Sequence, residues 1–381
     1  MKIAVPKECT AGERRVALTP DAVAGLVKSK LEVIVETGAG DSAFHRDEAF
    51  VQAGASIVPD AATLYSQAAI VTKVQRPTLE EVEQLQEGTV LVSFLQALTA
   101  TDVVQRLAAR RVTSFGMEGI PRISRAQKMD ALSSQANIAG YKAVLIAAES
   151  MAKFFPMMMT AAGTVFAARV LVIGAGVAGL QALATARRLG AQVWGYDVRP
   201  VVKEQVESLG AKFLQLDLGV TDAEDKGGYA KALAADTSRR QQELLNEKCK
   251  DFDVIITTAL VPGKAAPRLL TRDTVAGMRP GAVIVDLAAE AGGNCELTEP
   301  DQVVTKHGVT IHGPTNLPAT MPVHASQLYA RNVTELLREF VKDGALALQL
   351  DDEVIKGACV THNGEIVNEA VAAAVATRRS A

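Results

Sequence analysis

The chain has 381 residues, of which 48% are hydrophobic and 22% are charged, and a formal net charge of −3. This length exceeds that of one ordinary hydrophobic core, and the composition is that of a soluble globular protein, so two domains are expected. The small net charge gives no reason to expect nucleic acid or an anionic membrane surface as a partner, and no apolar run is long enough to span a bilayer.

The cysteines and histidines indicate neither disulfides nor a metal. The four cysteines lie far apart and form no C-x-x-C pair, which favours free thiols in a reducing cytoplasm. The five histidines show no metal-ligand spacing, so we predict no metal site. The first eight residues enter a strand pattern at once and are soon charged, which is not the pattern of a signal peptide.

Strand-like and helix-like runs alternate from Lys2 to about Gly116. This alternation predicts a parallel sheet with helices on both faces, and the unit has no glycine fingerprint with which to bind a dinucleotide by itself. We expect strands at Lys2–Val5, Glu32–Glu36, Ala69–Val74, Val90–Leu95 and Val112–Phe115, and helices at Pro20–Lys30, Glu48–Ala53, Asp60–Ala68, Leu79–Gln86 and Thr101–Arg110.

The alternation stops between Glu118 and Thr164. A polar stretch from Pro121 to Asn137 leads into a helix-forming run that continues to Glu149, which suits a helix that connects two domains. In an arbitrary protein a solvated linker helix would be the favoured interpretation of such a stretch. Here it joins a nucleotide domain to its neighbour, and ligands bind in clefts between domains, so the stretch is a candidate site.

The most informative stretch, residues 169–199, opens the second α/β unit. Its first apolar, β-branched run predicts a strand buried on both faces, and a helix-forming run and a second apolar run follow. Three glycines at G-x-G-x-x-G spacing separate the strand from the helix, and an acidic residue ends the second apolar run 18 residues after the last glycine; these residues are Gly174, Gly176, Gly179 and Asp197. Strand, glycines, helix, strand and acid in this order predict NAD binding.

Each glycine of the fingerprint has a physical role. Gly174 permits the tight turn from strand to helix, Gly176 lets a pyrophosphate approach the backbone, and Gly179 lets the helix pack closely on the strand. The free N–H groups at the start of the helix then face the phosphates.

Asp197 and the two residues after it are expected to surround the adenosine. The Asp197 carboxylate can accept hydrogen bonds from both hydroxyls of the ribose, with Val198 beside it. It also selects against NADP, because two unit charges about 4 Å apart repel by about 4 kcal/mol at an effective dielectric of 20. We interpret Arg199 as a solvated side chain or one that stacks on the adenine.

Two further strand ends are candidates for the same site. The segment 257–264 is suited to packing beside the cofactor through Ala259 and Leu260, and the segment 286–294 could line the cleft with Glu290 and Asn294. Ordinary strand-to-helix turns explain both segments equally well. Further strands of this unit are expected at Lys212–Leu216, Asp253–Thr258, Ala282–Leu287 and Thr310–Gly313, with a mobile surface loop over Gly219–Tyr229 and a helix over Lys231–Lys248.

The last part of the chain is expected to return to the first domain. It contains an amphipathic helix, Ser326–Lys342, and a hairpin signal around Asn363-Gly364. The sequence therefore predicts an α/β protein with two doubly wound, Rossmann-like parallel-sheet domains, the second inserted in the first, and a long connecting helix. The first domain would span residues 1–133 and 320–381, and the NAD(H)-binding domain residues 134–319.

Two cations of the first domain could bind a carboxylate substrate, since Arg15 and Lys73 stand at the edges of predicted strands. Isolated cations at such places are also ordinary solvated ends of elements. No Ser-His-Asp, Cys-His or paired-carboxylate constellation stands out, which argues against hydrolytic chemistry.

Long motifs in the chain resemble those of a known family. Arg15–Pro20, Lys73-Val74, the glycine fingerprint and Val285–Ala288 look like the superfamily of alanine dehydrogenases and the NAD(H)-binding component of proton-translocating NAD(P) transhydrogenase. The motifs that are specific to the transhydrogenase branch are Pro121–Gln135, Pro156–Thr164 and Gly227–Ala230. The similarity covers essentially the whole chain.

The resemblance implies a soluble, homodimeric component at the cytoplasmic face of the inner membrane. It would dock on an NADP(H)-binding component and on a membrane-spanning component that translocates protons, and pass hydride directly between NADH and NADP⁺. Val177 and Asp197 match positions around the pyrophosphate and the adenosine ribose, and Gly228 and Tyr229 match the mobile loop that closes over the nucleotide. The positions that match those holding and orienting the nicotinamide and its ribose are Arg122, Gln127, Asp130 and Ser133.

Two departures separate the chain from alanine dehydrogenases, which have a histidine acid/base where Gln96 stands and an aspartate where Glu290 stands. Making or breaking an imine requires a group that titrates near neutral pH, which glutamine cannot supply. Hydride exchange between two nicotinamides moves no proton at the reacting carbons. The transhydrogenase interpretation is therefore favoured, with Arg15 and Lys73 as relics or structural residues. Alanine dehydrogenase and an NAD-sensing regulatory protein are the alternatives.

Overall fold

The computed structural model describes residues 1–216, 234–261, 263–342 and 344–379. The chain forms two compact units, the first made of Met1–Gln135 and Pro318–Ala381 and the second of Ala136–Leu317. The second unit is therefore inserted in the first, as the sequence predicts. Among the described helices, none is both long and apolar enough to cross a membrane.

The first unit contains an eight-stranded sheet with the order β19-β18-β6-β5-β4-β1-β2-β3. Strands β1 to β6 are mutually parallel, and β18 and β19 form an antiparallel edge. The predicted C-terminal hairpin is confirmed, and the positive φ of Asn363 (49°) and Gly364 (91°) closes its turn. The strands are β1 Lys2–Val5, β2 Glu32–Glu36, β3 Ser56–Val58, β4 Ile70–Thr72, β5 Val90–Ser93, β6 Thr113–Gly116, β18 Cys359–His362 and β19 Glu365–Ile366.

Helices cover both faces of the first sheet, and a hydrophobic core lies under each set. Alternate residues of β1 enter different cores: Ile3 and Val5 pack with α1, α2, α11 and α12, whereas Ala4 packs with α3, α4, α5 and α13. The helices are α1 Pro20–Lys28, α2 Asp47–Gln52, α3 Ala61–Gln67, α4 Leu79–Gln84, α5 Thr101–Ala109, α11 Pro322–Phe340, α12 Glu353–Ala358 and α13 Glu369–Arg379.

The second unit contains a seven-stranded sheet with the order β11-β10-β9-β12-β13-β15-β14, parallel except for β14. The chain runs from β9 outward through β10 to β11 and then returns to the other side of β9 with β12. The strand order thus reverses between β9 and β12, where sheets of this type bind ligands at their carboxyl ends. The strands are β9 Arg169–Ile173, β10 Gln192–Tyr196, β11 Lys212–Phe213, β12 Val254–Thr257, β13 Val283–Asp286, β14 Val303–Lys306 and β15 Val309–His312.

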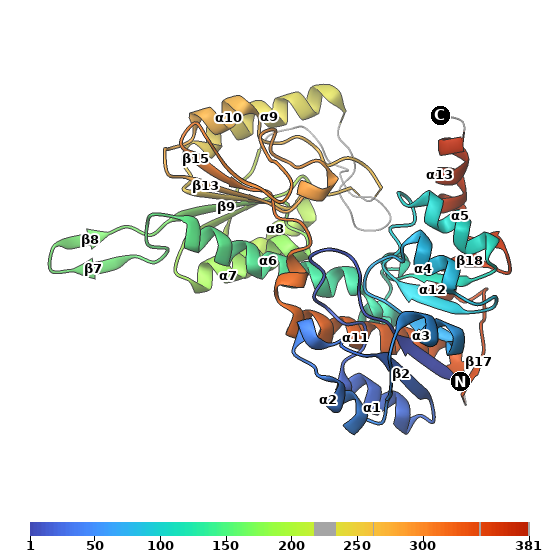
Figure 1. The fold of residues 1–381 in the computed structure, drawn as a ribbon. Coiled ribbons are helices and arrows are strands. Elements are labelled where there is room, and N and C mark those ends of the chain that lie inside the picture. Colours follow the sequence, from blue (N-terminus) through green and yellow to red (C-terminus); the bar gives the residue numbers. More distant parts are fainter. Residues whose placement is uncertain (217–233, 262, 343, 380–381) are drawn as a thin grey trace. The chain divides into compact units, whose positions relative to one another are not determined.

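Helices also cover both faces of the second sheet. Figure 1 shows α9 (Ala235–Cys249) and α10 (Arg272–Gly277) above it and α7 (Val177–Arg188) and α8 (Lys203–Ser208) below it. The predicted long helix is α6 (Ala131–Ser150), whose residues from Ala136 onward belong to this unit. A Cβ added to Gly140 of α6 would lie 2.1 Å from the Ala178 carbonyl oxygen of α7, so the two backbones approach closely.

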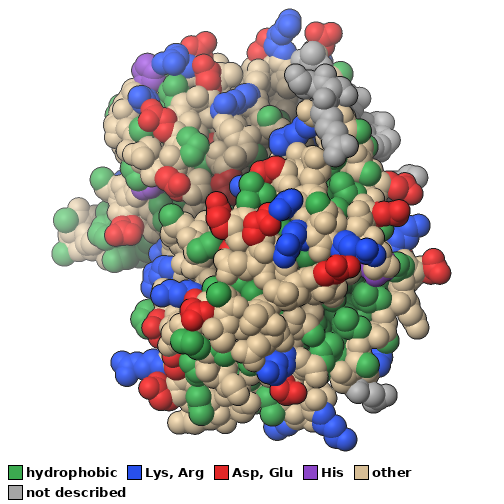
Figure 2. Space-filling view, turned by 45° about the vertical axis from the view of Figure 1, so that its right-hand side comes forward, with side chains coloured by type: hydrophobic (Ala, Val, Ile, Leu, Met, Phe, Trp, Pro, Cys, Tyr) green, Lys and Arg blue, Asp and Glu red, His purple; other side chains and the backbone are tan. Residues whose placement is uncertain are grey.

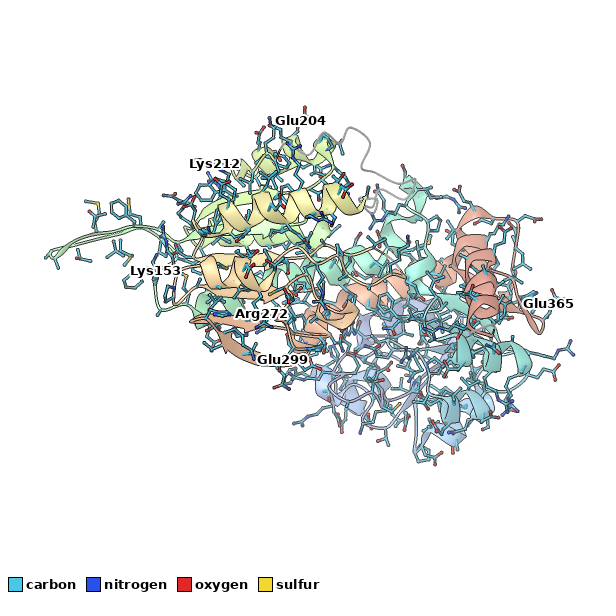
Figure 3. The ribbon with its side chains drawn as sticks, turned by 90° about the horizontal axis from the view of Figure 1, so that it is seen from above. Lys153, Glu204, Lys212, Arg272, Glu299 and Glu365 are labelled. Carbon is cyan, nitrogen blue, oxygen red and sulfur yellow. The ribbon has the colours of Figure 1, made fainter. Side chains whose placement is uncertain are left out.

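A two-stranded hairpin of β7 (Met158–Thr160) and β8 (Gly163–Val165) extends away from the rest of the second unit (Figure 1). The sequence pattern does not predict this hairpin. All residues of both strands are exposed, and Figure 2 shows hydrophobic side chains over this projection. Near its base the ammonium group of Lys153, labelled in Figure 3, lies 2.7 Å from the Asp253 carboxylate.

All four cysteines are free thiols, as the sequence predicts, and three of them are buried. Cys249 and Cys295 lie in a core of the second unit, and Cys359 lies in a core of the first. Burial raises the pKa of Cys249 and of Cys359 to about 12 and that of Cys295 to about 11.

Candidate nucleotide-binding site

The fingerprint forms the turn between β9 and α7, and two of its glycines are required by the protein itself. Gly174 has a φ of 98°, and a Cβ there would lie 2.5 Å from the Thr258 hydroxyl oxygen. A Cβ on Gly179 would lie 1.8 Å from the Gly174 carbonyl oxygen, which accepts a 3.0 Å hydrogen bond from Thr258 Oγ1. Side chains at either position would therefore disrupt the turn.

Gly176 is different, because nothing lies within 4 Å of a Cβ added there. It is the N-cap residue of α7, and its carbonyl accepts the first helical bond, from Leu180. The N–H groups of the first helical turn, which starts at Val177, have no partner within the helix and carry its positive end. The protein thus leaves open space next to backbone donors, and this combination fits a pyrophosphate.

The carboxylate of Asp197, at the end of β10, is tied to the fingerprint turn. It accepts a 2.8 Å hydrogen bond from the Ala175 backbone N–H, and it also receives the backbone N–H of Arg199 at 2.9 Å. The guanidinium group of Arg199 donates from Nε and Nη2 at 2.9 and 2.8 Å. Of the two interpretations of Arg199, the solvated side chain is wrong, because the side chain is 12% exposed and is paired with a carboxylate that is 5% exposed. Stacking on the adenine stays a prediction.

Polar bonds organise the ends of β12 and β13. The Asn294 side chain is fully buried and bridges the backbone of Ala259 in both directions, with bonds of 2.9 and 2.8 Å. The buried Asp286 carboxylate accepts from four donors, among them Thr257 Oγ1 at 2.9 Å and Thr298 Oγ1 at 2.7 Å. Asn294 thus holds the backbone of Ala259 in place.

The other candidates of the second unit are more accessible. Leu260 is 45% exposed and Val198 is half-buried against a core. Glu290 is exposed, and its carboxylate accepts a 2.6 Å bond from the Asn316 backbone N–H. Gly228, Tyr229 and the rest of the surface loop expected over residues 219–229 lie outside the described residues.

The candidates from the polar stretch lie in the first unit. Gln127 belongs to the 3₁₀ turn Ser124–Met129, and Arg122 lies just before that turn. Both side chains are exposed. Asp130 precedes α6, and its two carboxylate oxygens accept the backbone N–H of Ser133 at 2.8 Å and its hydroxyl at 2.6 Å. This pair caps the amino terminus of α6, directly after the 3₁₀ turn that carries Gln127.

The two cations proposed for a carboxylate substrate are buried in ion pairs. The Arg15 guanidinium binds Glu13 through Nε and Nη2 at 2.8 and 2.6 Å. The Lys73 ammonium lies 2.7 Å from Glu81 and 3.4 Å from Glu8, and its side chain is 1% exposed. Neither is a solvated end of an element.

The charge state of Lys73 follows from its surroundings. Burial by itself would lower the pKa of Lys73, but the carboxylates of Glu8 and Glu81 raise it above the ordinary lysine value. Lys73 therefore stays protonated and links the segments of the first unit that carry these two carboxylates.

Gln96 lies in the loop that follows β5. Its backbone is left-handed, with a φ of 51°, and its side-chain oxygen accepts a 2.8 Å bond from Arg76. The surrounding loop is held by the half-buried Glu118 carboxylate, which accepts hydrogen bonds from the backbone N–H groups of Leu95 and Ala97. In the described ranges no cluster of His, Cys, Asp and Glu could hold a metal ion.

Sequence reasoning missed several residues that organise this site. Thr258 and Asp286 hold the turn and the strand ends through buried bonds, and the pairing of Arg199 with Asp197 was not foreseen. The available signal for Thr258 was its place directly after the buried strand β12, inside the candidate segment 257–264.

Two family models together match nearly the whole chain. They are described as the alanine dehydrogenase/PNT N-terminal domain, which matches residues 4–139, and the alanine dehydrogenase/PNT C-terminal domain, which matches residues 143–369. The chain belongs to this family. Alanine dehydrogenase/PNT proteins are oxidoreductases, and membership implies NAD(H) binding.

Named relatives of the family lie in both of its branches. The chain is 52% identical to the first part of NAD(P) transhydrogenase subunit alpha of Rhodospirillum rubrum, over 97% of this chain and 99% of the relative. It is 31% identical to alanine dehydrogenase of Staphylococcus saprophyticus, over 98% and 97% of the two chains.

Solved structures of both branches also match. The crystal structure of transhydrogenase from Sinorhizobium meliloti has a TM-score of 0.85 and 40% identity, over 97% of this chain and all of that chain. A structure of L-alanine dehydrogenase has a TM-score of 0.82 and 27% identity, over 99% of both chains. The fold is thus common to the two branches, and the sequence identity favours the transhydrogenase branch.

Proposed function

We propose that the chain is the NAD(H)-binding component of a proton-translocating NAD(P) transhydrogenase. It binds NADH and passes hydride directly to NADP⁺ bound on a partner component, and a membrane-spanning component couples this transfer to proton movement. The observation that carries the proposal is 52% identity with a transhydrogenase subunit alpha over almost the full length of both chains.

The nucleotide site supports NAD(H) as the ligand. Open space at Gly176, the amino terminus of α7 and the carboxylate of Asp197 form the three parts that a dinucleotide needs. A carboxylate at this strand end favours a ribose with free hydroxyls over one with a 2′-phosphate, because it accepts from the former and repels the latter.

Gln96 disfavours the alternative, alanine dehydrogenase. Oxidation of an amino acid needs a group that exchanges a proton near neutral pH, and an amide held by Arg76 does not titrate there. Transfer between two nicotinamides needs no such group. The chain then contributes to the reaction by positioning: it holds the two nicotinamide rings at near-attack distance and excludes water from them.

Four residues of the first unit are proposed to orient the nicotinamide and its ribose, namely Arg122, Gln127, Asp130 and Ser133. Bound NADH supplies the hydride, and these side chains supply geometry. The cap formed by Asp130 and Ser133 supports this role, because it fixes the start of α6 next to the exposed Gln127.

We also propose a homodimer and association with the membrane through the partner components. The hairpin of β7 and β8 supports a protein–protein contact, because Met157, Met159 and Phe166 are 57%, 81% and 75% exposed on one projection. Exposed apolar side chains that gather in one place mark an interaction site.

The deciding experiment mixes the purified chain with the NADP(H)-binding component of a transhydrogenase, NADH and NADP⁺. We expect fast hydride exchange that depends on both proteins, and no exchange with any cognate partner would refute the proposal. The isolated chain with alanine and NAD⁺ is the control and should give no NADH. NADH binding without partner-dependent turnover would indicate a regulatory NAD sensor.

A further inference from the structure

A cavity of about 530 Å³ lies in the first unit, between the last turns of α1 and α11. These two helices contact each other (Figure 1). The base of the cavity is apolar, because the buried side chains of Leu26, Leu31 and Leu337 line it. A Cβ added to Gly25, which also lines the cavity, meets no atom within 4 Å, so the space beside α1 is open. The volume is in the range of small-molecule sites.

Four exposed cations line this cavity, and its described lining residues include no acid; the cations are Lys28, Lys30, Arg338 and Lys342. Two of them have partners. The Arg338 guanidinium lies 2.5 Å from the Glu335 carboxylate, and the Lys342 ammonium donates to the Arg338 backbone carbonyl at 2.6 Å. Within the part of the chain that the structure describes, the ammonium groups of Lys28 and Lys30 have no carboxylate partner. Two uncompensated positive charges thus stand beside an apolar base.

Lys30 occupies a backbone position that favours glycine, since its φ is 62°. Its N–H group donates to the Val27 carbonyl at 2.9 Å, and the N–H group of Leu31 donates to the Leu26 carbonyl at 3.2 Å, which is the Schellman ending of a helix. Left-handed backbone costs a lysine free energy that it does not cost a glycine, so the fold alone favours glycine here. The helices α2, α7 and α8 end with the same two bonds and have glycine at this position, namely Gly54, Gly190 and Gly210.

We propose that this cavity binds a soluble phosphate monoester that has an apolar body. At pH 7 such a phosphate carries a charge of about −1.5 to −2, which matches the two ammonium groups of Lys28 and Lys30. Lysine binds phosphate as a point charge, and the apolar body of the ligand covers the leucines of the base. The site uses none of the residues proposed to bind NADH, so this inference goes beyond the proposed function.

The other two cations allow an anion to bind at this place. The carboxyl-terminal end of a helix carries a partial negative charge that repels an anion. Arg338 lies in the last turn of α11 and Lys342 binds a carbonyl of that turn, so both offset the negative end of α11. Lys28 lies in the last turn of α1 and offsets its negative end in the same way, whereas Lys30 lies beyond the helix. Lys30 is therefore the residue whose charge the helix ends do not explain.

The test is a calorimetric titration of the full chain with phenyl phosphate, at a concentration of NADH that saturates the nucleotide site. We expect saturable binding that weakens as salt is added. Lys30→Gly should weaken this binding at least about tenfold, because a charged partner of the phosphate is lost. Inorganic phosphate should bind the wild type more weakly than phenyl phosphate, since it leaves the leucines of the base in contact with water.

Arg111→Gly is the matched control. Arg111 has a φ of 56° and holds the same Schellman position after α5, but it is not among the residues that line the cavity. Glycine suits both positions, so neither substitution should lower Tm. Only Lys30→Gly should lose affinity for phenyl phosphate.

Three results would overturn the proposal: no saturable binding of phenyl phosphate, equal losses in Lys30→Gly and Arg111→Gly, or inorganic phosphate bound as tightly as phenyl phosphate. Vesicles of phosphatidylcholine with and without phosphatidylglycerol distinguish a lipid headgroup from a soluble ester. If the chain bound only the anionic vesicles, through Lys30, and not phenyl phosphate, a soluble ligand would be refuted. A chain that binds no NADH would refute the proposed function and leave this inference standing, because the comparison of the two glycine variants does not depend on NADH.

Discussion

Substitutions of two fingerprint glycines are predicted to have different effects: one should lower the stability of the fold, and the other should lower the affinity for NADH. Gly179→Ala places a Cβ 1.8 Å from the Gly174 carbonyl oxygen, far inside the 3.0 Å that real Cβ contacts respect. That oxygen is held by Thr258 and cannot simply turn away. Overpacking of this kind costs about 1–3 kcal/mol, and the better helix propensity of alanine returns at most about 1 kcal/mol.

Gly176→Ala meets no atom within 4 Å in the protein. Alanine is a poorer N-cap than glycine by up to about 1 kcal/mol. This loss is offset by about 0.4–1 kcal/mol, because alanine lowers the conformational entropy of the unfolded chain. The stability should therefore stay close to that of the wild type. The methyl group would, however, stand where the pyrophosphate approaches the backbone, so NADH affinity should fall at least about tenfold, or about 1.4 kcal/mol.

The assay combines calorimetric unfolding with an NADH fluorescence titration of each variant. Each kcal/mol lost should lower Tm by about 2–4 °C in a unit of this size, so Gly179→Ala should melt several degrees early. Gly25→Ala in α1, where a Cβ also meets nothing, is the control for a tolerated glycine substitution outside the site. A Gly176→Ala variant that binds NADH as tightly as the wild type would refute the reasoning.

Three further changes test other parts of the molecule. Gln127→Asn should slow hydride exchange in the two-component assay far more than it weakens NADH binding, and equal losses would leave Gln127 a binding role only. Asp352→Ala removes the cap of α12 and the acceptor of Arg125, and should cost about 0.5–2 kcal/mol in denaturant unfolding at pH 7. The hydrogen bond from Arg125 lowers the pKa of Asp352 below 3.8 in the folded chain. The stability that Asp352 contributes is therefore fully present above its unfolded-state pKa and is lost as the pH falls through its folded-state pKa. If Asp352→Ala cost as much stability at acid pH as at pH 7, this reasoning would be contradicted. Met159→Asp on the hairpin should shift the sedimentation of the proposed dimer toward monomer, whereas Val51→Asp, at an exposed residue of the first unit, should not.

The sheets of both units could be predicted because their strands are apolar runs buried on both faces. Val170–Ile173 and Val254–Thr257 carry that signal in their composition alone. The three-residue strand Ser56–Val58 does not, since it is too short and has one exposed end. The hairpin of β7 and β8 also escaped prediction, because its apolar side chains face water and no core gives them a periodicity.

The positions of charged side chains could not be predicted from pattern. Arg199 folds back on a residue two positions earlier, a contact that depends on the local backbone and not on the residue types. The ion pairs of Lys73 with Glu8 and Glu81 form only when the tertiary fold brings these residues together. The glycine turn before α7 and the place of Asp197 after β10 were predictable, because strand, glycines, helix, strand and acid follow one another in a fixed order in this type of fold.

The buried thiols give each unit its own reporter of unfolding. With pKa values of about 11 to 12, fewer than about one in 1,000 of these groups is a thiolate at neutral pH, so alkylating reagents must wait until the surrounding core opens. The alkylation rate of Cys359 then reports the opening of the first unit, and the alkylation rates of Cys249 and Cys295 report the opening of the second. Mass spectrometry of peptides labelled over time would thus resolve two stabilities in one uncut chain, with the exposed Cys9 as the marker of reagent delivery.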